Sequence, residues 1–156
     1  MLNVVKEKKG DTLTVILTGA IEETVDFNEM IGDPGPSLWV NVKGISRINS
    51  VGVKAWIQYF QKLKESGVEV RIQECSTAMV EQMNLIKNFM AGAEVESIYV
   101  PFGCTQCGAE LVGNFTLKKI KELEFEIPDL KCTKCGGSAE FDDVPEEYFS
   151  FLMEQV

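Results

Sequence analysis

The stretch LWVNVKGISRINSVGVKAWIQYFQKLKESGVEVRI, residues 38–72, changes its hydrophobic period twice. Apolar and polar residues alternate over Ser37–Val42, which predicts a strand with two different faces. Residues 50–65 then place apolar side chains at helical spacing, and Ser66-Gly67 supplies the glycine that commonly ends a helix. That helical stripe consists of Val53, Trp56, Ile57, Phe60 and Leu63. Alternation returns over Val68–Ile72, so we expect a strand, a helix and a second strand, the unit of α/β folds.

The residues before this stretch predict more β structure. Residues 2–18 are expected to form a hairpin around Lys9-Gly10-Asp11, because apolar and β-branched residues flank a turn sequence. A short helix is expected within Glu22–Ile31, and the Gly32–Pro36 cluster ends it.

The residues after it continue the alternation of helices and strands. A second amphipathic helix is expected over about Ser76–Met90, with Ser76 or Thr77 as its cap. Val95–Val100 supplies a last strand, and Pro101-Phe102-Gly103 is typical of a boundary. We therefore expect an α/β domain over residues 1–101, with a mixed β-sheet and helices packed on it.

The composition is that of a folded, acidic protein. The chain has 156 residues, 45% of them hydrophobic and 25% charged, with a formal net charge of −9 and no histidine. The acidity argues against general nucleic-acid binding, although Lys118, Lys119 and Lys121 form either a local basic face or an ordinary solvated one. No segment reaches the roughly 20 apolar residues that span a bilayer. We expect a cytoplasmic protein without a membrane partner.

The strongest local signal is a pair of C-x-x-C-G knuckles separated by 24 residues. Each knuckle places two thiolates on one side of a tight turn, and the glycine after it lets the backbone amides approach the sulfurs. Four thiolates satisfy tetrahedral Zn²⁺ and leave no open position for catalysis. We predict a structural zinc site. Its ligands are Cys104, Cys107, Cys132 and Cys135.

The surroundings of the knuckles resemble the zinc-ribbon family. Leu111 and Val112 precede Gly113-Asn114, and apolar and acidic residues alternate over 122–127, which predicts a β-hairpin between the knuckles. We expect a small zinc-ribbon β domain over residues 102–156, closed by a helix that begins at Pro145. The apolar edge of that helix either packs between the domains or docks a partner. It comprises Tyr148, Phe151, Leu152 and Val156.

Other chemistries of the cysteines stay open. Rubredoxin-like iron uses the same four thiolates, but the proline and aromatic residues usual around such knuckles are missing. We expect no leader sequence, and disulfides are disfavoured in such a chain. Cys75, outside both knuckles, is either a buried small hydrophobe or a sensor thiol.

The first 101 residues resemble the STAS family, the anti-sigma-factor-antagonist and sulfate-transporter domain. The resemblance rests on the stretch 38–72 and on the order of the elements around it. In that family an Asp-Ser-Ser/Thr-Gly turn opens a helix, and a serine within it is phosphorylated by a partner kinase that is also the anti-sigma factor. The aligned residues here are Asn49, Ser50, Val51 and Gly52. Because Asn49 and Val51 depart from the motif, the resemblance leaves Ser50 as the single candidate phosphate acceptor.

Two roles are open for Ser50. Backbone N–H groups and the helix dipole stabilise a phosphate at a helix N-terminus, and the phosphate would add a charge of about −1.5 to −2. The same position suits a helix cap, which stabilises a fold by about 1 kcal/mol.

Together these features predict a non-enzymatic regulatory protein-interaction module of bacterial signalling. The resemblance implies that the partner is a regulatory protein, an anti-sigma factor or kinase, and that phosphorylation of Ser50 is the switch. The alternative from another class is a metal-thiolate redox or electron-transfer protein. A nucleic-acid accessory role is disfavoured by the acidity, and the lack of histidine makes a classical hydrolase hard to build.

Overall fold

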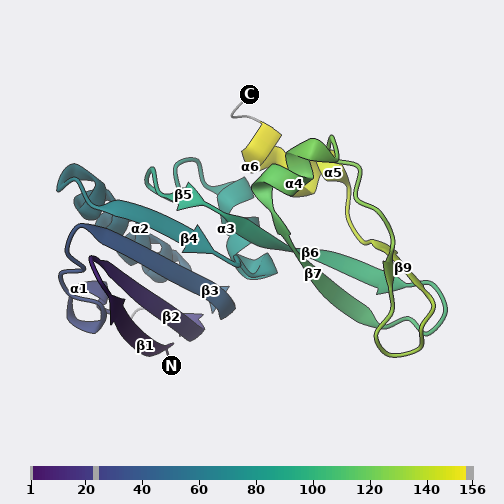
Figure 1. Cartoon of the computed structure of the whole chain (residues 1–156), viewed down its shortest axis with the longest axis horizontal. Coiled ribbons are helices and arrows are strands. Elements are labelled where there is room, and N and C mark those ends of the chain that lie inside the picture. Colours follow the sequence, from purple (N-terminus) through teal and green to yellow (C-terminus); the bar gives the residue numbers. More distant parts are fainter. Residues whose placement is uncertain (1, 23–24, 154–156) are drawn as a thin grey trace.

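The computed structural model describes residues 2–22 and 25–153, which form two β-sheets flanked by helices (Figure 1). The first sheet has the strand order β1-β2-β3-β4-β5, with β1 (Leu2–Lys9), β2 (Thr12–Ile21), β3 (Ser37–Ile48), β4 (Glu69–Gln73) and β5 (Glu94–Val95). The second has the order β7-β6-β9-β8, with β6 (Ser97–Cys104), β7 (Glu110–Thr116), β8 (Leu130–Lys131) and β9 (Ser138–Phe141). The helices are α1 (Phe27–Met30), α2 (Ser50–Glu65), α3 (Thr77–Leu85), α4 (Leu117–Glu122), α5 (Pro145–Tyr148) and α6 (Ser150–Met153). The predicted α/β class with a mixed sheet is confirmed.

The opening hairpin and the central strand-helix-strand unit follow the sequence pattern. Strand β1 pairs antiparallel with β2, and Lys9 faces Thr12 across the Gly10-Asp11 turn. Strands β2, β3, β4 and β5 run parallel to one another. Strand β3 continues past the predicted end at Val42, because its second half pairs with the end of β2 across two register shifts. Helix α2 has the predicted bounds.

The core of the first sheet lies between one sheet face and helix α2. Alternate residues of the strands point to this face, while Ile16 of the opposite face is 44% exposed. The ring of Trp56 packs within 4.3 Å of Phe60 and 5.7 Å of Phe89, measured between ring centroids. The buried strand residues are Val15, Leu17, Leu38, Val40, Val42, Val70 and Ile72.

Two predicted helices are shorter than expected. Of the segment Glu22–Ile31, only Phe27–Met30 is helical, capped by Asp26, and residues 23 and 24 lie outside the described residues. Helix α3 is capped by Ser76, as predicted, but it ends at Leu85 and not at Met90. The chain turns there because Ile86 is extended, and this turn buries Phe89 against Trp56. That aromatic contact outweighs the helical spacing of the methionines.

The strand predicted over Val95–Val100 is divided between the two sheets. Strand β5 contains only two residues, and β6 continues through Pro101 to Cys104 as part of the second sheet. The boundary predicted between residues 101 and 102 therefore falls inside β6. The division into two domains stays a prediction.

A polar junction ties β6 to the first sheet. The backbone of Cys75 forms an isolated parallel β-bridge with that of Ile98, and the Cys75 N–H donates to the Ser97 carbonyl at 3.0 Å. The preceding residue, Glu74, has a left-handed backbone with φ of 51°, and its carboxylate accepts hydrogen bonds from the Tyr99 hydroxyl and the Asn41 amide. Cys75 is fully buried, and burial raises the pKa of its thiol, which favours the core role over a sensor role.

The segment between the knuckles does not form the predicted strand. Helix α4 begins after the capping residue Thr116 and ends at Glu122, and the left-handed φ values of Glu124 and Phe125 then reverse the chain. This reversal places the ring of Phe125 at 5.9 Å from that of Phe149. Gly113-Asn114 lies within β7 and is not a turn. The predicted hairpin is thus replaced by two hairpins, β6-β7 and β8-β9.

The C-terminal helices pack on α3 and on the second sheet, which agrees with the internal packing given as the first of the two predicted alternatives. Tyr148, Phe151 and Leu152 are buried, whereas Val156 lies outside the described residues. The Asn84 side chain of α3 donates to the Tyr148 carbonyl at 2.9 Å and accepts from the Phe151 N–H at 2.9 Å.

Within the described residues, no helix has the length and apolarity that crossing a membrane requires.

Candidate metal centre

Each C-x-x-C-G motif forms the turn of a hairpin. Cys104 ends β6, with the first turn leading to β7, and Cys132 directly follows β8 in the turn that leads to β9. The glycines after the motifs, Gly108 and Gly136, have φ values of 74° and 79°. Their N–H groups donate to the carbonyls of Cys104 and Cys132 at 3.1 and 2.9 Å, so both turns close in the same way. Glycine adopts this left-handed conformation without steric cost.

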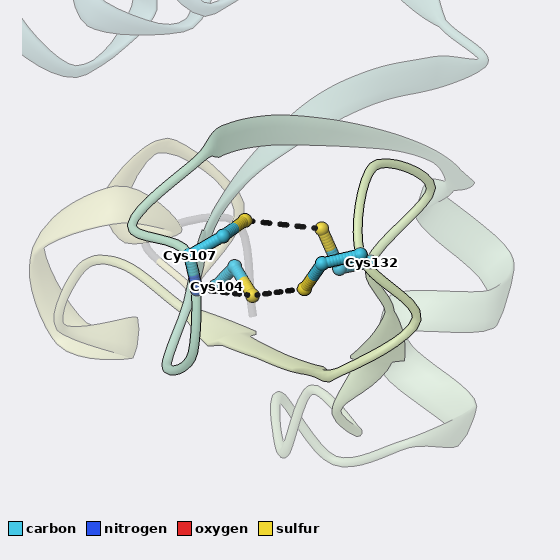
Figure 2. A group of neighbouring side chains, drawn as sticks. Cys104, Cys107 and Cys132 are labelled. Atoms are coloured by element: carbon cyan, nitrogen blue, oxygen red, sulfur yellow. Dashed lines mark hydrogen bonds between the residues drawn. The ribbon is translucent and has the colours of Figure 1, made fainter.

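Strand pairing brings the two turns face to face. Ala139 of β9 lies opposite Cys104 of β6, and Thr105 donates to the Ser138 carbonyl through both its N–H and its hydroxyl, at 3.0 Å each. The sulfurs of the four cysteines point toward one another from the facing turns, as Figure 2 shows for Cys104, Cys107 and Cys132. The sequence therefore identified all four members of the cluster.

The sulfur positions suit one tetrahedral metal ion. All four Sγ atoms lie within 4.8 Å of one another, with 3.4 Å between Cys104 and Cys135 and 3.7 Å between Cys107 and Cys132. Four metal–sulfur bonds of about 2.3 Å in tetrahedral geometry place the sulfurs about 3.8 Å apart. A disulfide needs about 2.05 Å. The cluster is thus a set of free thiols spaced to hold a metal.

Backbone amides polarise the thiols unequally. The N–H groups of Cys107 and Gln106 donate to the Cys104 sulfur at 3.4 Å and lower the pKa of Cys104 to about 6. Amides of the second turn likewise lower the pKa of Cys132. The Gly137 amide lowers the pKa of Cys135, but the neighbouring cysteines Cys104 and Cys107 outweigh it and raise this pKa to about 12. A metal ion would remove this mutual penalty, because its charge stabilises all four thiolates.

The cluster has a buried side and an open side. Cys104 and Cys132 are buried, while Cys107 and Cys135 are exposed. With four protein sulfurs and no histidine in the chain, the ligand shell has no position left for a substrate. This arrangement suits a structural or electron-transfer centre better than a hydrolytic one.

Ser50 lies apart from the cluster, at the start of α2 on the first sheet (Figure 1). The capping role considered for Ser50 belongs to Asn49, whose side chain accepts from the Gly52 N–H at 2.8 Å. Ser50 is the first helical residue and is exposed. Gly52 packs so tightly on β2 that a Cβ there would lie 2.3 Å from the Ile21 carbonyl oxygen.

Comparisons with known proteins add little to this description. No protein-family model matches the chain, and no curated protein matches it. One similar solved structure is the crystal structure of Mglu in its L-glutamate binding form in the presence of 4.3 M NaCl, with a TM-score of 0.35 and 15% sequence identity. The match covers 44% of this chain. It covers 26% of the other chain, so this chain spans about a quarter of that protein's length. The STAS resemblance therefore stays a prediction.

Proposed function

We propose that this protein is a non-enzymatic regulatory interaction module of the cytoplasm, in which a structural zinc ribbon extends an antagonist-like α/β domain. The observation that carries the proposal is the closed set of four thiols, which can hold a metal but offers it no free coordination position. Structural zinc sites have this composition and stabilise small β domains. The partner would be a regulatory protein of the anti-sigma factor or kinase class, as the STAS resemblance implies.

Zinc is the metal we expect in this site. Iron in four thiolates would have the same geometry and would make the protein an electron carrier. We expect protein purified from its native host under reducing conditions to contain one zinc per chain by elemental mass spectrometry and to be colourless. Red protein with one iron per chain would replace the proposal by the electron-transfer alternative, and protein without stoichiometric metal would contradict both.

The interaction surface we propose surrounds the N-terminus of α2. Helix α2 has 16 residues, so its dipole favours an anion at Ser50. Ser50 is exposed and so is accessible to a kinase. Val51 beside it is 50% exposed and offers an apolar side chain to a partner. A phosphate added there would repel an acidic partner surface. Against an apolar partner surface it would be a buried charge without a counter-ion.

We expect Ser50 to be the phosphorylated residue. Intact-mass analysis of protein from the native host should show one phosphate, which is lost in Ser50→Ala and retained in Ser46→Ala, a matched exposed serine of β3. Ser50→Asp should weaken binding to the partner kinase at least tenfold, whereas Ser46→Asp should change it less than twofold. A phosphate that persists in Ser50→Ala would refute the switch without affecting the metal assignment.

A further inference from the structure

A groove with a volume of about 870 Å³ lies where the loop after α3 faces helices α4 and α6. These three segments are far apart in the sequence but lie side by side near the junction of the two sheets (Figure 1). The residues that give the groove its apolar floor are Met83, Ile86, Phe89, Leu117, Phe151 and Leu152. No sequence motif signals this groove, because each segment contributes only one to three of these six apolar residues.

The groove walls are fixed by packing and hydrogen bonds. The ring of Phe89 stacks on that of Trp56 at 5.7 Å with an interplanar angle of 11°, which anchors the loop after α3 in the core. The N–H of Leu117 donates to the Glu96 carbonyl at 3.0 Å and holds the start of α4 against the end of β5. The groove is therefore a built feature of the fold and needs no rearrangement to form.

Three lysines give the rim a positive charge. Lys87, Lys118 and Lys121 line the groove and are exposed. Across the described ranges 2–22 and 25–153, no carboxylate lies within ion-pair distance of these three ammonium groups. The two acidic residues of the lining, Glu94 and Glu96, approach Arg71 at 3.5 and 3.8 Å and share this one cation with Glu69 at 3.9 Å. The groove lining thus has three lysines against two carboxylates.

This charge pattern runs against that of the whole protein. The chain has a formal net charge of −9, so three lysines that have no ion-pair partner among the described residues are a local reversal of sign at this groove. An anion entering the groove would meet three ammonium groups and two carboxylates that share Arg71, so the lysines outnumber the acidic residues of the lining. Charge complementarity thus selects an anionic ligand with an apolar body.

The size of the groove favours a small organic molecule over a peptide helix as its ligand. Sites for small organic ligands have volumes of about 300 to 1,000 Å³, with mostly apolar walls and a few polar groups that orient the ligand. The groove fits that range and that composition. We propose that it binds an amphiphilic organic anion, whose hydrocarbon body lies on the floor and whose carboxylate or phosphate head contacts Lys118 and Lys121.

Methionine methyl groups provide a direct test with dodecanoate as the probe. Met83 and Met90 line the groove, whereas Met30 of α1 does not. In metal-loaded, full-length protein carrying ¹³C-methyl methionine, dodecanoate below its micellar concentration should shift the Met83 and Met90 signals saturably and leave Met30 unchanged. Dodecyltrimethylammonium and dodecyl maltoside, which share the hydrocarbon chain, should bind at least tenfold more weakly.

Charge reversal separates a specific head-group contact from general hydrophobic adsorption. The double variant Lys118→Glu, Lys121→Glu should bind dodecanoate at least tenfold more weakly, and both residues are exposed, so the fold should persist. The control variant Lys6→Glu, Lys8→Glu makes the same charge change on exposed residues of β1 and should alter the affinity less than twofold. Three outcomes would each overturn the proposal. The first is that dodecyltrimethylammonium binds as tightly as dodecanoate, and the second is that both double variants lose the same affinity for dodecanoate. The third is that only an acidic peptide shifts the Met83 and Met90 signals. None of these outcomes depends on Ser50 or on a partner protein.

Discussion

Chelation of the metal proposed for the cysteine cluster should unfold the knuckle end of the second sheet while the first sheet stays folded. The turns at residues 104–108 and 132–136 hold few buried apolar side chains, and their shared contacts are the sulfur cluster and the pairing of β6 with β9. A structural zinc ion contributes on the order of 10 kcal/mol to the folding of such units. The core of the first sheet, built on Trp56 and Phe60, contains none of the four cysteines.

Hydrogen exchange would measure this effect residue by residue. In metal-loaded protein, amides around the knuckles and in β9 should be protected, and a chelator should abolish that protection while β2, β3 and β4 keep theirs. Cys132→Ser should lose both the stoichiometric metal and the protection, because three thiolates and a hydroxyl bind zinc far more weakly than four thiolates. Cys75→Ala serves as the control, since Cys75 lies in the core of the junction and should leave metal binding unchanged. Protection that survives complete metal removal would contradict a folding role for the ion.

The sequence predicted those features whose causes are local. The period changes over residues 38–72 determine β3, α2 and β4, because each element's apolar face follows from its own spacing. The four cysteines could be identified for the same reason, since each C-x-x-C-G turn closes through hydrogen bonds within a few residues. The facing of the two turns was implied by the tetrahedral requirement of the metal.

The errors arose where distant contacts override local spacing. Residues 122–127 alternate like a strand, but Thr116 caps a helix just before them and Phe125 turns to meet Phe149. Helix α3 ends early for a comparable reason, because Phe89 packs on Trp56 from a position far away in sequence. Strand β6 passes through the predicted boundary at Pro101 because β7 and β9 both pair with it, and the sequence does not reveal these partners.

Phe149→Ala should lower the free energy of unfolding by about 3 to 5 kcal/mol, the cost of truncating a large buried aromatic side chain. Phe149 is fully buried between α5 and α6. Its ring lies 5.6 Å from that of Phe141 in β9 and 5.9 Å from that of Phe125. Removing the ring leaves a cavity that these neighbours cannot fill, since each is held by its own backbone.

Urea unfolding of the metal-loaded protein would measure this loss and would also test the division at residue 101. Tyr148, next to Phe149, bonds through its hydroxyl to the Tyr99 carbonyl, and Asn84 of α3 holds the backbone on either side. Because these contacts connect the second sheet to α3, we expect one transition that moves as a whole in Phe149→Ala. The exposed control Val112→Ala should shift the free energy by less than about 0.5 kcal/mol. A loss below about 1 kcal/mol would contradict the packing role of Phe149, and an early second transition confined to residues beyond 101 would establish two domains that unfold independently.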